Sequence, residues 1–420
     1  MVTVRILFTA WAWPSHVFPM VPLAWACQAA GHEVRVASTA SIEAAVAHTG
    51  LTSVVAGAEP DLPAMSTKGA LTSWHTQGRW PSEWTRHFDL LDPGQRGVLD
   101  ALAAKEIAMA EAMADGLVAF ARVWRPDLVV HDAVSYAGAV AASALGVPSA
   151  SHMWGSVDVM HNERTLEGEP RAELLRLFER FGAEPRIDPD VWLDPCPPRL
   201  RIAGGRGRQS IRYVPYNGPG ALPDWLIDPA PRRRVCVTWG VTTGRIGLGG
   251  PGDLLDEVVE AVGGLDAELV LALAPGQAER LGTLPEGTRV VEGLPLNLLL
   301  PSCDAVVHQG GGGTSMTSTA AGVPQLVVSP RPEQMLTGDR LAAVGAGRHL
   351  VRGELLREKD PVPVVREAVR ALLDDPSYRT RATELRDEVA AMPSPAGVVA
   401  VLERLVAERT GATREAAVAR

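Results

Sequence analysis

Residues 304–316, DAVVHQGGGGTSM, decide how the second half of this chain folds. A short apolar run leads into four consecutive glycines, and a helix-forming segment follows them. This order predicts a buried strand, a glycine loop and a helix, the repeating unit of a parallel sheet flanked by helices. Glycines before a helix leave backbone N–H groups uncovered, where the helix dipole adds about half a positive charge. The stretch therefore predicts an anion site, unless its glycines serve only a tight turn.

A diphosphate leaving group is the anion that fits this stretch best. The run is not a P-loop, because no Lys-Ser or Lys-Thr pair follows its last glycine. It also departs from the dinucleotide-binding fingerprint, because Met316 stands where the third glycine belongs. Four glycines exceed what a turn needs, and His308 places a hydrogen-bond donor beside the loop. Downstream, Glu333 and Gln334 follow another predicted strand and suit a polyhydroxylated ligand, although such a pair is also typical of a solvated loop.

The same strand–loop–helix unit recurs along the whole chain. In the first half, residues 4–10, 33–38 and 127–132 are predicted strands, and the helices between them end at glycines. A Pro/Gly-rich stretch at about 183–232 suggests the approach to an interdomain linker, after which the pattern restarts. We therefore expect an α/β fold with two doubly wound parallel sheets. The strands of the second half are expected at residues 235–239, 268–273, 304–308 and 326–328.

Composition excludes several classes of function. The chain has 420 residues and a net charge of −9, so its surface repels nucleic acid, and the arginines at 232–234 are interpreted as linker charges. Its four cysteines stand far apart, which indicates buried, reduced thiols. The apolar N-terminus is interrupted by prolines and lacks a basic flank, so we expect a cytoplasmic protein without a membrane anchor. The one Asp-x-Asp, at 188–190, lies in a Pro-rich stretch, and no metal site is expected.

Taken together, the motifs resemble the family 1 glycosyltransferases. The resemblance implies the GT-B architecture, in which two Rossmann-like domains face a cleft, and it is closest to the actinomycete transferases that attach deoxysugars to macrolide and anthracycline antibiotics. It spans nearly the whole chain. The matching segments are residues 15–26 with the following Ala-Gly-His-Glu-Val, 212–219, 308–314, 321–325, 333–334 and 345–347.

The resemblance implies an inverting, metal-independent transfer of a deoxysugar from a TDP-sugar to a hydroxyl of a polyketide-type aglycone. His16 would be the general base, with Asp132 orienting its imidazole. Three residues depart from the common pattern: Ser15, Gln309 and Glu333, of which the last bears on the identity of the sugar. The donor-binding residues that the resemblance implies are Gly240, Thr242, His308, Gly311, Gly312, Gly313, Thr314, Glu333 and Gln334.

The acceptor is expected to be large and apolar, because aromatic residues surround the predicted base. A flat polyketide would bury much apolar area against such rings. Residues 59–97, rich in Pro, Ser, Thr and Trp, are interpreted as an insertion of loops and short helices. From the resemblance, this insertion with its tryptophans Trp74, Trp80 and Trp84 is a candidate surface for an auxiliary activator protein. A homodimer is also allowed. The predicted acceptor-binding residues are Trp11, Trp13, Phe18 and Trp154.

The domain boundaries follow from the same reading. We expect an acceptor-binding domain at 1–217, a linker at 218–232 and a nucleotide-sugar-binding domain at 233–390. Residues 391–420 are expected to form a C-terminal helix that packs back on the first domain, ending in a loose tail. Two other functions stay open: transfer of the sugar to an aromatic carbon, and a non-catalytic homologue that only binds a nucleotide sugar.

Overall fold

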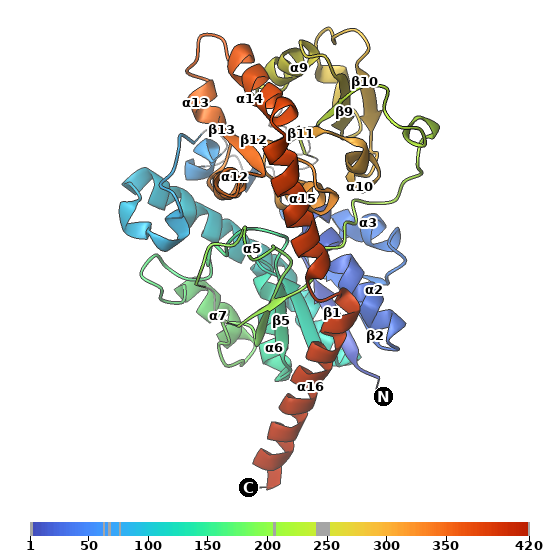
Figure 1. Cartoon of the computed structure of the whole chain (residues 1–420). Helices are drawn as coiled ribbons and strands as arrows, with labels where there is room; N and C mark the ends of the chain where they lie inside the picture. Colours follow the sequence, from blue (N-terminus) through green and yellow to red (C-terminus); the bar gives the residue numbers. More distant parts are fainter. Residues whose placement is uncertain are drawn as a thin grey trace.

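The computed structural model describes residues 3–61, 64–65, 69–74, 77–204, 207–240 and 253–418, and it divides them between two parallel sheets (Figure 1). The first sheet has the strand order β3-β2-β1-β4-β5-β6-β7, and all of its pairings are parallel. The order reverses on either side of β1, which is where ligands bind in such sheets. Its strands are β1 (Arg5–Thr9), β2 (Glu33–Ser38), β3 (Ser53–Val55), β4 (Leu128–Asp132), β5 (Ser149–His152), β6 (Val191–Asp194) and β7 (Arg208–Ser210).

The second sheet repeats this plan with the strand order β10-β9-β8-β11-β12-β13. Its pairings are also parallel, and here the order reverses around β8. Its strands alternate with helices, as the sequence predicts. The strands are β8 (Arg234–Val237), β9 (Glu268–Leu273), β10 (Arg289–Glu292), β11 (Ala305–His308), β12 (Gln325–Ser329) and β13 (Gly347–Val351).

Helices cover the faces of both sheets. The longest, α5, begins at a capping box in which the Asp92 side chain accepts from the Gln95 N–H and Gln95 returns a bond to the Asp92 backbone. The helices of four or more residues that the structure describes outside the 3₁₀ turns are α1 (Pro14–Val17), α2 (Val21–Ala29), α3 (Glu43–Ala47), α5 (Pro93–Trp124), α6 (Tyr136–Leu145), α7 (Ala172–Arg180), α9 (Leu255–Gly263), α10 (Leu296–Leu299), α11 (Gly312–Ala321), α12 (Pro332–Ala343), α13 (Arg352–Leu355), α14 (Val362–Asp374), α15 (Pro376–Ala391) and α16 (Pro395–Val418).

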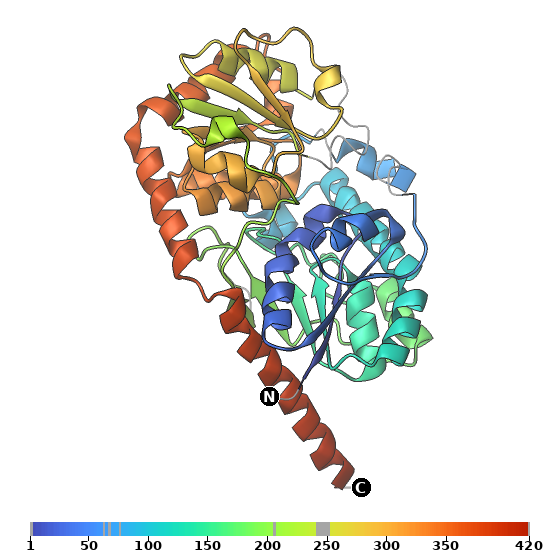
Figure 2. The same cartoon turned by 90° about the vertical axis from the view of Figure 1, so that its right-hand side faces the viewer.

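Helices α15 and α16 run along one side of the molecule, from the second sheet to the first (Figures 1 and 2). The start of α16 packs on α2, and Val398, Val399 and Leu402 belong to the same buried cluster as the strands of the first sheet. The helix continues to Val418, where the sequence predicts a loose tail. Chain continuity and shared apolar burial therefore tie the C-terminal segment to both halves.

The Pro/Gly-rich stretch at 183–232 is not only a linker approach, because it supplies β6 and β7 at the edge of the first sheet. Both strands are very short, and such strands leave little periodicity in a sequence.

Within the part of the chain that the structure describes, no single helix is long and apolar enough to cross a membrane, although the bent pair 376–391 and 395–409 meets those criteria jointly.

The tryptophans of the insertion at 59–97 face inward, so they do not form the exposed docking surface that the sequence predicts. Trp74, Trp80 and Trp84 are all buried. The Trp84 indole N–H donates to the Pro332 carbonyl oxygen at 3.3 Å, and its ring meets that of Trp80 edge to face. Nearby, Arg79 pairs with Glu354 of α13. The insertion therefore bridges the two halves, because its large rings gain more by burial between them than by exposure.

All four cysteines are free and buried, as the sequence predicts.

Candidate active site

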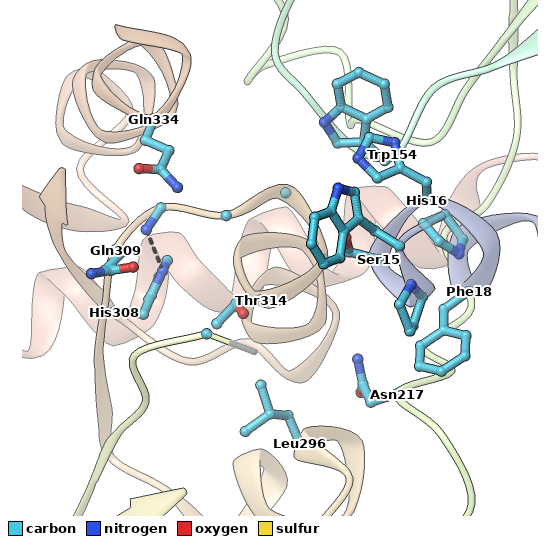
Figure 3. A pocket seen from close by; sticks show the side chains of 18 of the residues that line it. Ser15, His16, Phe18, Trp154, Asn217, Leu296, His308, Gln309, Thr314 and Gln334 are labelled. Atoms are coloured by element: carbon cyan, nitrogen blue, oxygen red, sulfur yellow. Dashed lines mark hydrogen bonds between the residues drawn. The ribbon is translucent and has the colours of Figure 1, made fainter. Parts of the chain in front are cut away.

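A large cavity lies between the two halves and takes its walls from both. Its volume is about 540 Å³, within the roughly 300–1,000 Å³ that is usual for small-molecule sites. His16 and His308 both line it. Figure 3 looks into the cavity, with His16 and Trp154 on one side, and His308, Gln309 and Gln334 on the other. The sequence-based expectation that the two histidines open onto one cavity is therefore met.

His16 and Asp132 meet where two neighbouring strands end. His16 lies in α1, the short helix after β1, and Asp132 is the last residue of β4, which pairs with β1. His16 Nδ1 is 3.1 Å from Asp132 Oδ2. The imidazole keeps 19% of its side-chain area exposed, whereas Asp132 is buried at 1%. Among the described residues no group bonds to His16 Nε2, so this nitrogen is available to a ligand in the cavity.

Aromatic rings hold the His16 imidazole from two sides. Trp11 stacks on it with ring centroids 5.3 Å apart and an interplanar angle of 19°, and Trp154 meets it edge to face at 5.0 Å. The Trp11 indole N–H donates to the Val134 carbonyl oxygen at 3.0 Å, which anchors the ring to the loop after β4. Trp13 and Phe18 also line the cavity. All four predicted acceptor-binding aromatics therefore share its wall.

The glycine run enters α11 at the cavity, as the sequence predicts. Gly310 has φ +89°, a left-handed conformation that favours glycine, and Gly311 is the N-cap of α11. The first N–H groups of a helix have no partners within it, and residues 311–314, which begin α11, line the cavity. A Cβ on Gly312 would lie 2.6 Å from Trp154 Cδ1, so the two halves touch at this glycine.

The structure does not support the predicted role of His308 as a donor to the diphosphate. The Gly310 N–H donates to His308 Nδ1 at 2.9 Å, and His308 Nε2 donates to Gln325 Oε1, also at 2.9 Å. Both ring nitrogens are thus engaged, and burial lowers the pKa of His308 to about 4, so the ring is neutral near pH 7. His308 instead holds the glycine turn in place. From the sequence alone, this structural role cannot be told apart from direct binding of the diphosphate.

Glu333 and Gln334 begin α12 beside this turn and line the cavity. Glu333 Oε2 and Gln334 Oε1 are buried oxygen atoms without a hydrogen-bond partner among the described residues. Burial raises the pKa of Glu333, while the nearby Arg331 acts in the opposite direction. Unpaired buried acceptors are costly unless a ligand or water satisfies them. The pair therefore suits a ligand rich in hydroxyl groups.

Gly240 follows β8 and lines the cavity, as expected for a residue near the phosphates. Thr242, predicted to act beside it, lies outside the described residues. The sequence analysis missed an apolar wall of this half, formed where β9 and β10 end. The sequence of this wall gives only a weak indication of a binding site, because short runs of Ala, Leu, Pro and Gly are typical of many loops. The wall consists of Ala272, Leu273, Ala274, Pro275, Gly293, Leu294 and Leu296.

Lys105 and Glu106 on α5 also line the cavity and were missed by sequence reasoning. Their one signal was a Lys-Glu pair in a largely apolar helical segment. Glu106 is 3% exposed and accepts from the Tyr136 hydroxyl at 2.9 Å and from Asn162 Nδ2 at 3.1 Å. Burial raises the pKa of Glu106 to about 8 and lowers that of Lys105 to about 8.

Two residues just before the second domain attach the halves to each other near α11. The Tyr213 hydroxyl lies 3.2 Å from both the Gly313 carbonyl oxygen and Thr317 Oγ1. Asn217 donates to Thr317 Oγ1 at 3.1 Å and accepts from the Asn297 N–H, also at 3.1 Å. The segment between the sheets therefore fixes the helix whose first turn faces the cavity.

Among the described residues, the acidic side chains do not form a cluster that could bind a metal ion. Within the described ranges no three His, Cys, Asp or Glu side chains are placed to hold an ion. Asp188 pairs with Arg164, and Asp190 accepts from Arg186 and from the Ser149 N–H. The Asp-x-Asp of the sequence is thus engaged in surface ion pairs and does not line the cavity.

Comparison with known proteins identifies the family. Two family models, the N-terminal and C-terminal domains of erythromycin biosynthesis protein CIII-like proteins, match residues 25–240 and 256–405. The 10-deoxymethynolide desosaminyltransferase of Streptomyces venezuelae is 36% identical over 438 aligned residues, covering 96% of this chain and 97% of that protein.

Solved structures agree over the same length. Glycosyltransferase VinC in complex with dTDP has a TM-score of 0.79 at 32% identity and covers 96% of this chain and 100% of its own. Spinosyn rhamnosyltransferase SpnG complexed with spinosyn aglycone has a TM-score of 0.77 at 30% identity, with 95% and 100% covered. The GT-B architecture predicted from the sequence is thereby confirmed, and the chain belongs to the erythromycin biosynthesis protein CIII-like family of glycosyltransferases.

Proposed function

We propose that this enzyme transfers a deoxysugar from a thymidine diphosphate sugar to a hydroxyl of a polyketide-type aglycone in antibiotic biosynthesis, with inversion at the sugar. One observation carries the proposal: the His16–Asp132 pair and the first turn of α11 line the same cavity from opposite halves. The relatives named above, with their macrolide acceptor, bound dTDP and bound aglycone, support this choice of substrates.

His16 takes the acceptor proton in the proposed mechanism. The acceptor hydroxyl lies against Nε2, and its proton passes to this nitrogen as its oxygen forms a bond to the anomeric carbon. Asp132, hydrogen-bonded to Nδ1, keeps Nε2 as the accepting nitrogen and stabilises the imidazolium that forms. The acceptor oxygen attacks the anomeric carbon from the face opposite the departing diphosphate, which gives inversion.

The leaving diphosphate is held by the backbone of the second half. As the bond from the anomeric carbon to the phosphate oxygen breaks, its electron pair passes to the diphosphate. The N–H groups of Gly311, Gly312, Gly313 and Thr314 meet this charge at the positive end of α11. Fixed donors of this kind contribute several kcal/mol in comparable sites, about 2.7–4 kcal/mol for one donor. Gly240 approaches the same phosphates from the end of β8, and the apolar wall at residues 272–275, 293, 294 and 296 accommodates the thymine ring of the donor.

The sugar then lies between the two halves. Glu333 Oε2 and Gln334 Oε1 accept hydrogen bonds from its hydroxyls, which satisfies two buried oxygen atoms. The aglycone packs on Trp11, Trp13, Phe18 and Trp154, since flat rings bury much apolar area at a small entropic cost.

We also propose that the reaction needs no metal ion, because backbone amides supply the positive field at the diphosphate. The buried free thiols favour a reducing, cytoplasmic setting. The auxiliary protein and the homodimer stay predictions.

The test is a screen of TDP-deoxysugars against polyketide aglycones, with glycosylated product followed by mass spectrometry. We expect turnover that is unchanged by EDTA, a product of inverted anomeric configuration, and a large loss of rate in His16→Ala. Cleavage of the product by mild acid indicates an O-glycoside. Resistance to acid would instead favour transfer to carbon, and binding of donors without any turnover would favour the non-catalytic alternative.

A further inference from the structure

One tryptophan of the first half contacts both the predicted base and the helix of the second half that faces it. Trp154 follows β5, and its ring meets the His16 imidazole edge to face, with the centroids 5.0 Å apart (Figure 3). A Cβ on Gly312, the first residue of α11, would lie 2.6 Å from Trp154 Cδ1 and 3.4 Å from Trp154 Nε1. The edge of the indole that carries the nitrogen therefore lies against the first turn of α11.

Backbone packing fixes the place of this indole relative to α11. A Cβ on Gly312 would also lie 3.1 Å from the Trp154 carbonyl oxygen, and a Cβ on Gly155, whose φ is +97°, would overlap with the Met316 side chain. The chain at 154–155 thus lies directly on the first turns of α11, at two positions where only glycine fits. The Trp154 ring also packs against the buried cluster that includes Trp11. Contacts with both halves therefore hold the indole in one position.

The Trp154 indole N–H has no acceptor among the described residues, although its side chain lines the cavity. By contrast, the Trp11 N–H is used within the protein, where it donates to the Val134 carbonyl oxygen at 3.0 Å. An indole nitrogen donates and does not accept, so Trp154 offers a ligand one donor. The backbone N–H groups at the start of α11, beside this edge, also lack partners within their helix. Donors from both halves thus come together at one place, which suits an anion.

We propose that the Trp154 indole N–H donates to the diphosphate of the donor, so that the acceptor-binding half also helps to hold the leaving group. This inference rests on the proposed function, because it requires the diphosphate to lie at the first turn of α11. The hydrogen bond strengthens as the diphosphate gains charge, because bonds to ionised acceptors are stronger than neutral ones. Only the edge of the ring is used, which leaves its face for the aglycone. The contact also holds the diphosphate close to His16, where the acceptor hydroxyl loses its proton.

Trp154→Phe tests the proposal, because it keeps an aromatic ring beside His16 and removes the N–H. The ligands are TDP, whose binding is measured by calorimetry, and thymidine, the same nucleoside without phosphates, measured by ligand-observed NMR. In Trp154→Phe we expect TDP affinity to fall by about tenfold or more, as for loss of a hydrogen bond to a charged group, and thymidine affinity to stay within about twofold. Trp124→Phe, at the end of α5 and outside the cavity, is the matched control and should keep both affinities.

The outcomes separate this inference from the proposed function. A TDP affinity in Trp154→Phe within about twofold of wild type would overturn the inference, because the N–H would then not reach the diphosphate. Equal losses of TDP and thymidine affinity would also overturn it, since the loss of ring packing would be responsible. If the wild-type enzyme bound thymidine as tightly as TDP, the diphosphate site itself would be wrong, and the proposed function would fall together with this inference.

Discussion

His16 of the first half and His308 of the second both line the cavity, and the two differ in what holds them. His16 has one nitrogen bonded to a buried carboxylate and the other unpaired among the described residues, with part of its ring exposed. His308 has both nitrogens bonded inside the protein and is 1% exposed. The first arrangement suits a group that gains and loses a proton, while the second suits one that must stay neutral and still. The same residue type is therefore placed to exchange a proton with a ligand in one half and to hold a turn in the other.

The strongest test of this contrast is His16→Ala. Loss of the proton acceptor should lower kcat by about 10²–10⁴-fold, the usual contribution of a general base, while TDP affinity stays within about twofold. Steady-state kinetics and calorimetric titration with TDP measure the two effects. His87→Ala, on the exposed surface, is the matched control. A kcat within threefold of wild type would end the assignment of His16 as base.

Asp132→Asn probes the partner of the base with little change of shape. The amide cannot stabilise an imidazolium as a carboxylate does, so we expect kcat to fall by about 10²-fold with a smaller change in KM. Unaltered kinetics would show that Asp132 serves the fold alone.

Gly312→Ala tests how closely the two halves meet at the predicted diphosphate site. The new Cβ would lie 2.6 Å from Trp154 Cδ1 and 3.1 Å from the Trp154 carbonyl oxygen, so the halves must separate slightly. We expect TDP affinity to fall by about tenfold, in line with the 1–3 kcal/mol typical of overpacking. Gly97→Ala in α5, where a Cβ meets nothing within 4 Å, is the control. Equal TDP affinities for the two variants would contradict the expected contact.

His308→Gln is expected to have the smallest effect, and this effect is on the free energy of unfolding. Burial lowers the pKa of His308 from 6.5 to about 4, so the folded state binds fewer protons than the unfolded state between these values. The stability contributed by the neutral ring is therefore complete above pH 6.5 and is lost as the pH falls toward 4. Between pH 7 and 5.5 the wild type should lose about 1 kcal/mol through this group, and the variant should lack that loss.

Denaturant unfolding at several pH values measures this difference, with the exposed His87→Gln as control. Parallel pH dependences for wild type and His308→Gln would contradict a neutral, buried His308. Buried His152, whose pKa burial also lowers to about 4, contributes equally to both proteins and cancels in the comparison.

Sequence reasoning located most of the site because strand ends and glycines mark it locally. His16, Asp132 and the glycine run lie where strands end, and parallel strands bring those ends to one edge of a sheet. The role of His308 was beyond sequence reasoning, because both of its partners depend on the folded turn and on β12. The tryptophans of the insertion were misplaced for a related reason: an apolar ring in a loop is equally compatible with a docking surface and with burial between domains.

What the sequence determined by itself is therefore the repeating α/β plan, the two parallel sheets, the glycine-lined helix start and the histidine after the first strand. These are local patterns of hydrophobicity and backbone freedom, and they do not depend on distant contacts. Only the tertiary structure decided which histidine remains available, how α5 brings Lys105 and Glu106 into the cavity, and how the insertion bridges the halves. Those features depend on the packing of segments far apart in sequence, because burial and hydrogen-bond partners are fixed only when the halves meet.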